Sequence, residues 1–121
     1  MKIFKRIRNQ FSKEKHAYYK MQRKHRKELI KLVKEDRDWD WEYLHVLVIT
    51  KIRHMHEYLS AGNCVMECEE TPQIIAELKH VLDLQNEIDT QKPHFLVNEF
   101  EVEKYKEIYE YIGSNLLGWW D

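Results

Sequence analysis

The sequence predicts an all-α protein: an antiparallel helical bundle of three body helices plus a basic N-terminal helix or arm. The 121 residues include only 3 glycines and 2 prolines, so few positions interrupt a helix. Hydrophobic residues make up 43% and charged residues 34% of the chain, a mixture typical of amphipathic helices. Apolar residues also recur at spacings of three and four through every long segment. A chain of this length holds one modest core.

The first helix is predicted from Lys2 to about Lys34, a stretch with neither proline nor glycine. An interrupted apolar stripe follows it through Ile3, Ile7, Phe11, Tyr18, Met21, His25, Leu29, Leu32 and Val33. At about 1.5 Å per residue such a helix spans on the order of 45 Å. That length exceeds what the body needs, so we expect the first third to project or fray.

Charge divides the chain into two parts. Residues 1–34 contain 13 Lys and Arg and 2 acidic residues, a net charge of +11, whereas residues 35–121 contain 7 and 19, a net charge of −12. This asymmetry predicts a basic helical arm, residues 1–34, attached to an acidic helical bundle, residues 35–121.

The central helix is predicted over residues 39–63 and carries the longest uninterrupted apolar stripe. The stripe consists of Trp41, Leu44, Val48, Ile52, Met55 and Leu59. Carboxylates at Asp38, Asp40 and Glu42 favour the start of the helix, and Gly62 with Asn63 favours its end. A second, weaker apolar face predicts packing on two sides, at the centre of a bundle or in an oligomer interface.

Two further helices follow. Thr71 at the cap position and Pro72 after it predict a helix start, and the apolar stripe continues to Asp89. Asn98 and Glu101 form a capping-box pattern, after which a last helix is expected to run to Trp119. Because a tryptophan carries a large apolar surface, we expect at least one residue of the terminal pair Trp119 and Trp120 to be docked.

No pattern of residues identifies a reaction. The histidines and carboxylates do not converge at metal-ligand spacings, so we expect no metal, no cofactor and no catalytic residue. The sequence lacks a membrane-spanning run and a signal peptide, which predicts a cytoplasmic protein. In that compartment Cys64 and Cys68 are expected to be free thiols.

Recognition of a ligand or partner is the remaining kind of function. Aromatic side chains at two helix ends, beside a few cations, suit a purine-phosphate ligand through stacking and charge-assisted hydrogen bonds. The candidate residues are Trp39, Trp41, Lys51, Arg53, His54, Trp119 and Trp120. The alternative is that these tryptophans only close the bundle.

The basic arm permits several further interpretations. It can lie on nucleic acid, rest on an anionic membrane surface, or pair with acidic protein, either its own second half or a neighbouring copy. The candidate nucleic-acid contacts are Lys5, Arg6, Arg8, Arg23, Lys24, Arg26 and Lys27. A solvated cationic face that complements the acidic body is the simplest interpretation.

Part of the sequence resembles a family. The start of the central helix at Asp38 and Trp39, the helix from Ile75 to Ile88 and the terminal Trp119-Trp120-Asp121 are similar to a group of small uncharacterised helical proteins of tailed bacteriophages. The resemblance covers roughly residues 38–121 and implies an accessory protein in the host cytoplasm.

We therefore expect a non-enzymatic, self-associating accessory or anti-defence protein that binds a nucleotide-like signal or a host protein. The alternatives are a nucleic-acid-binding protein that uses the basic helix, and a small virion or assembly component.

Overall fold

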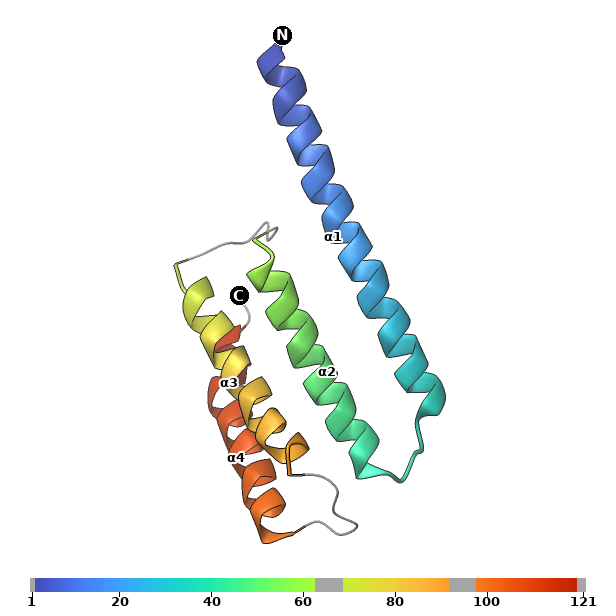
Figure 1. Cartoon of the computed structure of the whole chain (residues 1–121), viewed down its shortest axis with the longest axis vertical. Coiled ribbons are helices and arrows are strands. Elements are labelled where there is room, and N and C mark those ends of the chain that lie inside the picture. Colours follow the sequence, from blue (N-terminus) through green and yellow to red (C-terminus); the bar gives the residue numbers. More distant parts are fainter. Residues whose placement is uncertain (1, 63–68, 92–97, 120–121) are drawn as a thin grey trace.

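The computed structural model confirms the all-α bundle (Figure 1). It describes residues 2–62, 69–91 and 98–119, with only the helical backbone for residues 2–12, 14 and 15. The described elements are α1 (Lys2–Glu35), α2 (Trp41–Ser60), α3 (Thr71–Asp89), α4 (Glu99–Asn115) and a terminal 3-10 turn, η1 (Leu116–Trp119).

Consecutive helices run antiparallel, so α2 and α4 point the same way and α1 and α3 point the other way (Figure 1). α2 packs between α1 and α3, and α4 packs on α3 and also reaches α2, where Tyr105 and Tyr109 contact Trp41 and His45. The predicted two-sided packing of α2 is therefore confirmed. α1 packs closely on α2, so most of the surface of α1 faces away from the body.

α1 is much longer than the helix that supports it. It has 34 residues against 20 in α2, or about 51 Å against about 30 Å at 1.5 Å per residue. Its N-terminal part extends past the end of α2 (Figure 1). The projection expected from the sequence is present.

The core is centred on α3 rather than on α2. Among the described residues, the buried hydrophobic side chains are Ile52, Leu78, Val81, Leu84, Ile88, Ile108 and Trp119. Four of these seven belong to α3, because that helix is covered by α2 on one side and α4 on the other. In α2 the apolar stripe is only partly buried, with Ile52 at 4% exposure and Leu44 at 65%.

Side-chain caps set the starts of α2 and α4. Asp40 Oδ1 accepts a hydrogen bond from the Glu42 amide at 3.0 Å, so α2 begins at Trp41 and Trp39 lies outside it. Asn98 Oδ1 accepts from the Glu101 amide at 2.9 Å, as the capping-box pattern predicted. Gly62, with a φ of 70°, follows the end of α2.

Two predicted helix ends differ from the structure. Thr71 is the first helical residue of α3 rather than its cap, and the cap position, Glu70, makes no side-chain capping bond. The last α-helix stops at Asn115 instead of Trp119, because the chain tightens into η1. In η1 the Trp119 side chain is buried and its Nε1 donates to Glu77 Oε2 on α3 at 2.7 Å.

None of the described helices is long and apolar enough to cross a membrane.

Candidate functional site

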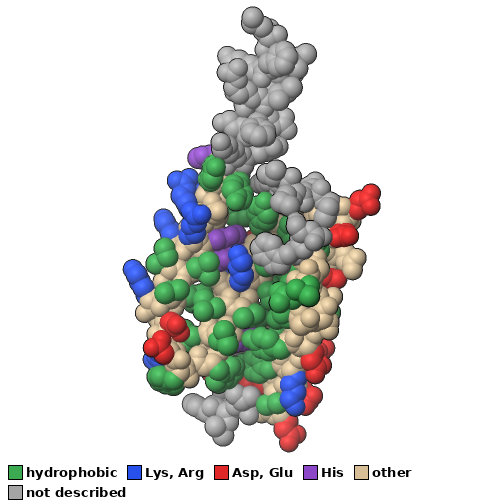
Figure 2. Space-filling model, turned by 180° about the vertical axis from the view of Figure 1, so that it is seen from behind, with side chains coloured by type: hydrophobic (Ala, Val, Ile, Leu, Met, Phe, Trp, Pro, Cys, Tyr) green, Lys and Arg blue, Asp and Glu red, His purple; other side chains and the backbone are tan. Residues whose placement is uncertain are grey.

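A stripe of positive charge follows the outer side of α1. It consists of Lys13, Lys20, Arg23, Lys24, Lys27, Lys31 and Lys34, all of which are exposed. At about 100° per residue these seven positions fall within an arc of about 100°. The partly buried residues Met21, His25 and Leu32 lie on the opposite side of the helix and face α2. In the view from behind, Lys and Arg side chains line the α1 edge of the molecule (Figure 2).

The cationic stripe is not neutralised by the acidic body. Within the described ranges, the ion pairs involve other cations, and none of the seven stripe residues takes part in one. Arg23 makes one weak hydrogen bond, from Nε to the Tyr19 carbonyl at 3.4 Å. The stripe is therefore a solvated cationic face, as one sequence-based interpretation has it, and among the described residues it makes no direct ion pair with the acidic body.

The nucleic-acid contacts predicted from the sequence divide into two groups. Arg23, Lys24 and Lys27 belong to the stripe, and Arg26 is exposed beside it. The side chains of Lys5, Arg6 and Arg8 lie outside the described part of the structure. The sequence-based prediction did not include the other four stripe residues, Lys13, Lys20, Lys31 and Lys34. Their spacings of three, four and seven residues, counted together with Lys24 and Lys27, indicate one face of a helix.

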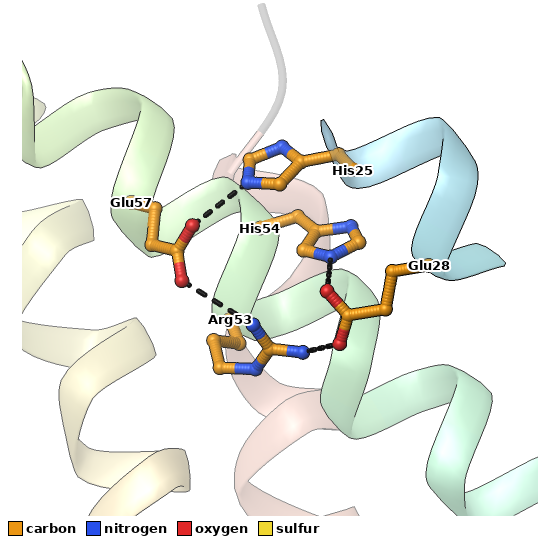
Figure 3. Close-up of polar contacts among 5 residues, drawn as sticks. All are labelled: His25, Glu28, Arg53, His54 and Glu57. Atoms are coloured by element: carbon orange, nitrogen blue, oxygen red, sulfur yellow. Dashed lines mark hydrogen bonds and ion pairs between the residues drawn. The ribbon is translucent and has the colours of Figure 1, made fainter. Parts of the chain in front are cut away.

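A polar network joins α1 to α2 (Figure 3). His25 Nε2 on α1 lies 2.8 Å from Glu57 Oε2 on α2, and His54 Nε2 on α2 lies 3.1 Å from Glu28 Oε2 on α1. Each helix thus contributes a histidine and, three residues later, a carboxylate, and each histidine reaches the carboxylate of the other helix.

The two halves of the network are tied together twice. The His25 and His54 rings stack with their centroids 3.8 Å apart and their planes at 10°. Arg53 bridges the carboxylates, since it pairs with Glu28 and donates from one terminal nitrogen to Glu57 Oε1 at 3.3 Å. This arrangement fixes the register of α1 on α2, and therefore the direction in which the cationic stripe points.

Burial and hydrogen bonding shift the pKa values in the network. Burial lowers the pKa of His54, whose side chain is only 4% exposed, and the positive charges of His25 and Arg53 act in the same direction. The hydrogen bond from His25 lowers the pKa of Glu57. For Glu28, burial acts to raise the pKa, but the bonds from His54 and Arg53 outweigh it and the net shift is downward. Both carboxylates are therefore ionised at neutral pH.

Within one copy the structure does not bring together Trp41 and Trp119 of the aromatic ligand site predicted from the sequence, so that site stays a prediction for an interface between copies. Trp41 lies at the start of α2, where its ring meets Tyr105 edge-on at 5.4 Å, whereas Trp119 is buried near the opposite end of α4. Trp39 is 80% exposed and lies under the Arg37 guanidinium. Because α2 and α4 point the same way, the start of one and the end of the other cannot be neighbours.

The cations proposed for the same ligand are also dispersed. Arg53 and His54 are held in the α1–α2 network, and Lys51 is exposed on α2, about 15 Å along the helix from Trp41. Trp120 lies outside the described residues, as do Cys64 and Cys68. Of the expected contacts in the described structure, His54 and Trp119 are buried, Arg53 is partly exposed but held by two carboxylates, and Trp39, Trp41 and Lys51 are exposed.

A second buried histidine was missed by the sequence analysis. His45 Nδ1 lies 2.6 Å from the Tyr109 hydroxyl, and His45 Nε2 lies 2.6 Å from Gln85 Oε1. Because the Gln85 oxygen only accepts, Nε2 donates to it, and Nδ1 accepts the Tyr109 hydroxyl proton. Burial lowers the pKa of His45 and raises that of Tyr109. The partners are 40 and 64 residues away, so no local pattern reveals this contact.

Metal-ligating side chains do not gather in the described ranges: no group of three or more His, Cys, Asp or Glu residues there could hold a metal ion. Comparison of the chain with protein-family models, with curated proteins and with solved structures finds no match.

Proposed function

We propose that the protein is a non-enzymatic binding protein that holds double-stranded nucleic acid on the outer face of α1. One observation carries the proposal: seven exposed cations share one side of a continuous helix, and the described acidic groups of the protein neutralise none of them. Unpaired cations in line are the electrostatic footprint of a polyanion-binding surface.

The dimensions of the stripe suit a duplex. From Lys13 to Lys34 it extends over about 32 Å at 1.5 Å per residue. Double-stranded DNA presents one negative charge per about 1.7 Å of its axis, so a duplex laid along α1 offers more phosphates than the helix has cations.

The composition of the stripe distinguishes between kinds of polyanion. Single strands are usually held by several aromatic side chains that stack on successive bases, whereas Tyr19, at 46%, is the one exposed aromatic side chain along the described part of α1. A membrane-surface helix inserts a continuous apolar face into the lipid, but Met21 and Leu32 of α1 face α2, which leaves Tyr19, Ile30 and Val33 as the exposed large apolar residues in the described part of this helix. The phosphate backbone of a duplex needs only cations, which this surface supplies.

Within the wider range of functions expected from the sequence, the nucleotide-like ligand receives less support because its expected contacts are separated. The bacteriophage context stays part of the proposal: an accessory protein with this surface would act on nucleic acid in an infected cell.

The proposal is tested with two variants that remove the same charge from different places. Lys24→Gln/Lys27→Gln/Lys31→Gln removes three cations from the stripe. Arg37→Gln/Lys79→Gln/Lys106→Gln removes three exposed cations from the body. Binding of a fluorescently labelled duplex of about 30 base pairs is measured by anisotropy, with circular dichroism as a check on folding.

The stripe variant should bind about 10- to 100-fold more weakly than the unaltered protein, because three phosphate contacts are lost. The body variant should bind within about twofold of it. Equal weakening of the two variants would show that only net charge matters. No measurable binding by the unaltered protein at low salt would refute the proposal itself.

A further inference from the structure

The α1–α2 pair has two different sides. Glu28 and Arg53 form an ion pair across one side of it. At about 100° per residue, Ile30 and Val33 lie about 140° or more around α1 from Glu28. By the same measure Trp41, Leu44, Leu47 and Lys51 lie about 120° to 180° around α2 from Arg53. Five of these residues are apolar and Lys51 is a cation; together they define a surface, here called the open apolar face, on the side away from the ion pair.

The open apolar face is large and uncovered in a single copy. Ile30 is 54% exposed, Val33 63%, Trp41 51% and Leu44 65%. The back view shows hydrophobic side chains extending from α1 across the middle of the molecule towards α4 (Figure 2). The bundle stays open here because α1 packs closely on α2 but not on α4. Exposed apolar surface of this extent marks a contact with another molecule.

The chain carries a segment with the properties needed to cover such a face. Residues 2–15 continue α1 beyond the end of α2, over about 21 Å at 1.5 Å per residue, against about 30 Å for α2 itself. In the sequence Ile3, Ile7 and Phe11 recur every four residues, so a helix through them has an apolar stripe.

The segment and the body as a whole carry net charges of opposite sign, while the charged residue on the open apolar face itself is the cation Lys51. Residues 2–15 contain 6 Lys and Arg and 1 Glu, a net charge of +5, whereas residues 35–121 carry −12. The segment cannot fold back onto its own body, because it is the straight continuation of the helix that is docked on α2 (Figure 1). A second copy can receive it.

We propose that residues 2–15 of one copy cover the open apolar face of a second copy, and that two copies exchange these segments to form a closed dimer. In each contact the apolar face of one copy binds an amphipathic helix of the other copy, and two-fold symmetry makes the two contacts of the dimer the same. The exchange leaves the cationic stripe free, because Lys24, Lys27 and Lys31 lie on the opposite side of α1 from α2. Each dimer then presents two stripes.

The test is the mass of nucleic-acid-free full-length protein in solution, measured by sedimentation equilibrium from about 1 to 100 µM. Leu44→Glu places a charge on the open apolar face. Val46→Glu is the matched control, because Val46 is also exposed on α2, at 41%, but lies about 20° from Arg53 on the other side. Phe11→Glu changes the exchanged segment. Circular dichroism verifies that each variant is helical.

The unaltered protein and Val46→Glu should have twice the chain mass of 15.0 kDa, and Leu44→Glu and Phe11→Glu should have the chain mass. A mixture of Leu44→Glu and Phe11→Glu should contain more dimer than either variant alone, since one of the two segment–face contacts is intact in the mixed dimer. A monomeric unaltered protein, or a Leu44→Glu or Phe11→Glu variant that is as dimeric as the unaltered protein, would overturn the proposal. Because no nucleic acid is present, none of these outcomes depends on the proposed function.

Discussion

Mild acid should destabilise the folded protein through two buried histidines. His45 and His54 are 6% and 3% exposed, and burial is the main cause of the lowered pKa of each. Their ordinary pKa is 6.5, which applies to the unfolded chain. Below that pH the unfolded chain takes up protons that the folded protein does not.

The sign and size of the effect follow from this difference. The contribution of each histidine to stability is fully present above pH 6.5 and is lost as the pH falls from 6.5 towards the lower folded-state pKa. One extra proton in the unfolded state gives a slope of at most about 1.4 kcal/mol per pH unit, so two histidines give at most about 2.7. A loss of this size over one pH unit is a large fraction of the free energy of unfolding, about 5–15 kcal/mol, that is usual for a small domain.

Urea unfolding at pH 7.5, 6.5, 5.8 and 5.2 measures this slope. The lowered pKa values of Glu28 and Glu57 act in a different range, since their contribution is lost only as the pH falls below about 4.5. His54→Gln and His45→Gln should each reduce the slope by up to about 1.4 kcal/mol per pH unit, because each removes one of the two sites at which the unfolded chain takes up a proton. Stability that is constant or rises as the pH falls from 6.5 would refute the reasoning.

Three further predictions concern the bundle. Ile108→Ala should lower the free energy of unfolding by about 2–5 kcal/mol, because Ile108 is 0% exposed, while Leu117→Ala, at 89% exposure, should stay within about 0.5 kcal/mol in the same urea titration. Asn98→Ala should cost about 1 kcal/mol through loss of the α4 cap, and Asn98→Asp, which keeps an accepting oxygen, should restore most of it in thermal unfolding. Trp119→Phe removes the donor to Glu77 but keeps much of the buried ring, so chemical denaturation should show a loss of about 1–2 kcal/mol; no loss would mean that the bond to Glu77 is not formed.

The sequence predicted the helices well because helix signals are local. The Asn98–Glu101 pair and the apolar spacing from Ile74 to Ile88 each act within one or two turns, and both features appear as expected. The predicted end of α4 was wrong because the chain tightens into η1 there. That turn places Trp119 against Glu77, a contact between residues 42 positions apart that no local pattern indicates.

The candidate site was predicted less completely. The excess of cations in residues 1–34 identified α1 as the basic element, but not which cations would remain unpaired. The stacking of His25 on His54 depends on how α1 is placed on α2, and the buried position of His45 depends on residues from two other helices. Such contacts follow from packing, which a periodicity in one segment does not specify. The separation of Trp41 from Trp119 within one copy depends on packing in the same way.

The claim that α1 holds duplex nucleic acid through its cationic stripe is tested most directly by the salt dependence of binding. The seven stripe residues limit the slope of log K against log salt concentration to about −6, and engagement of most of them should give about −4 to −6 for any duplex sequence. Lys24→Gln/Lys27→Gln/Lys31→Gln should reduce that slope by nearly three. A slope near zero, or one that the triple substitution leaves unchanged, would contradict the account.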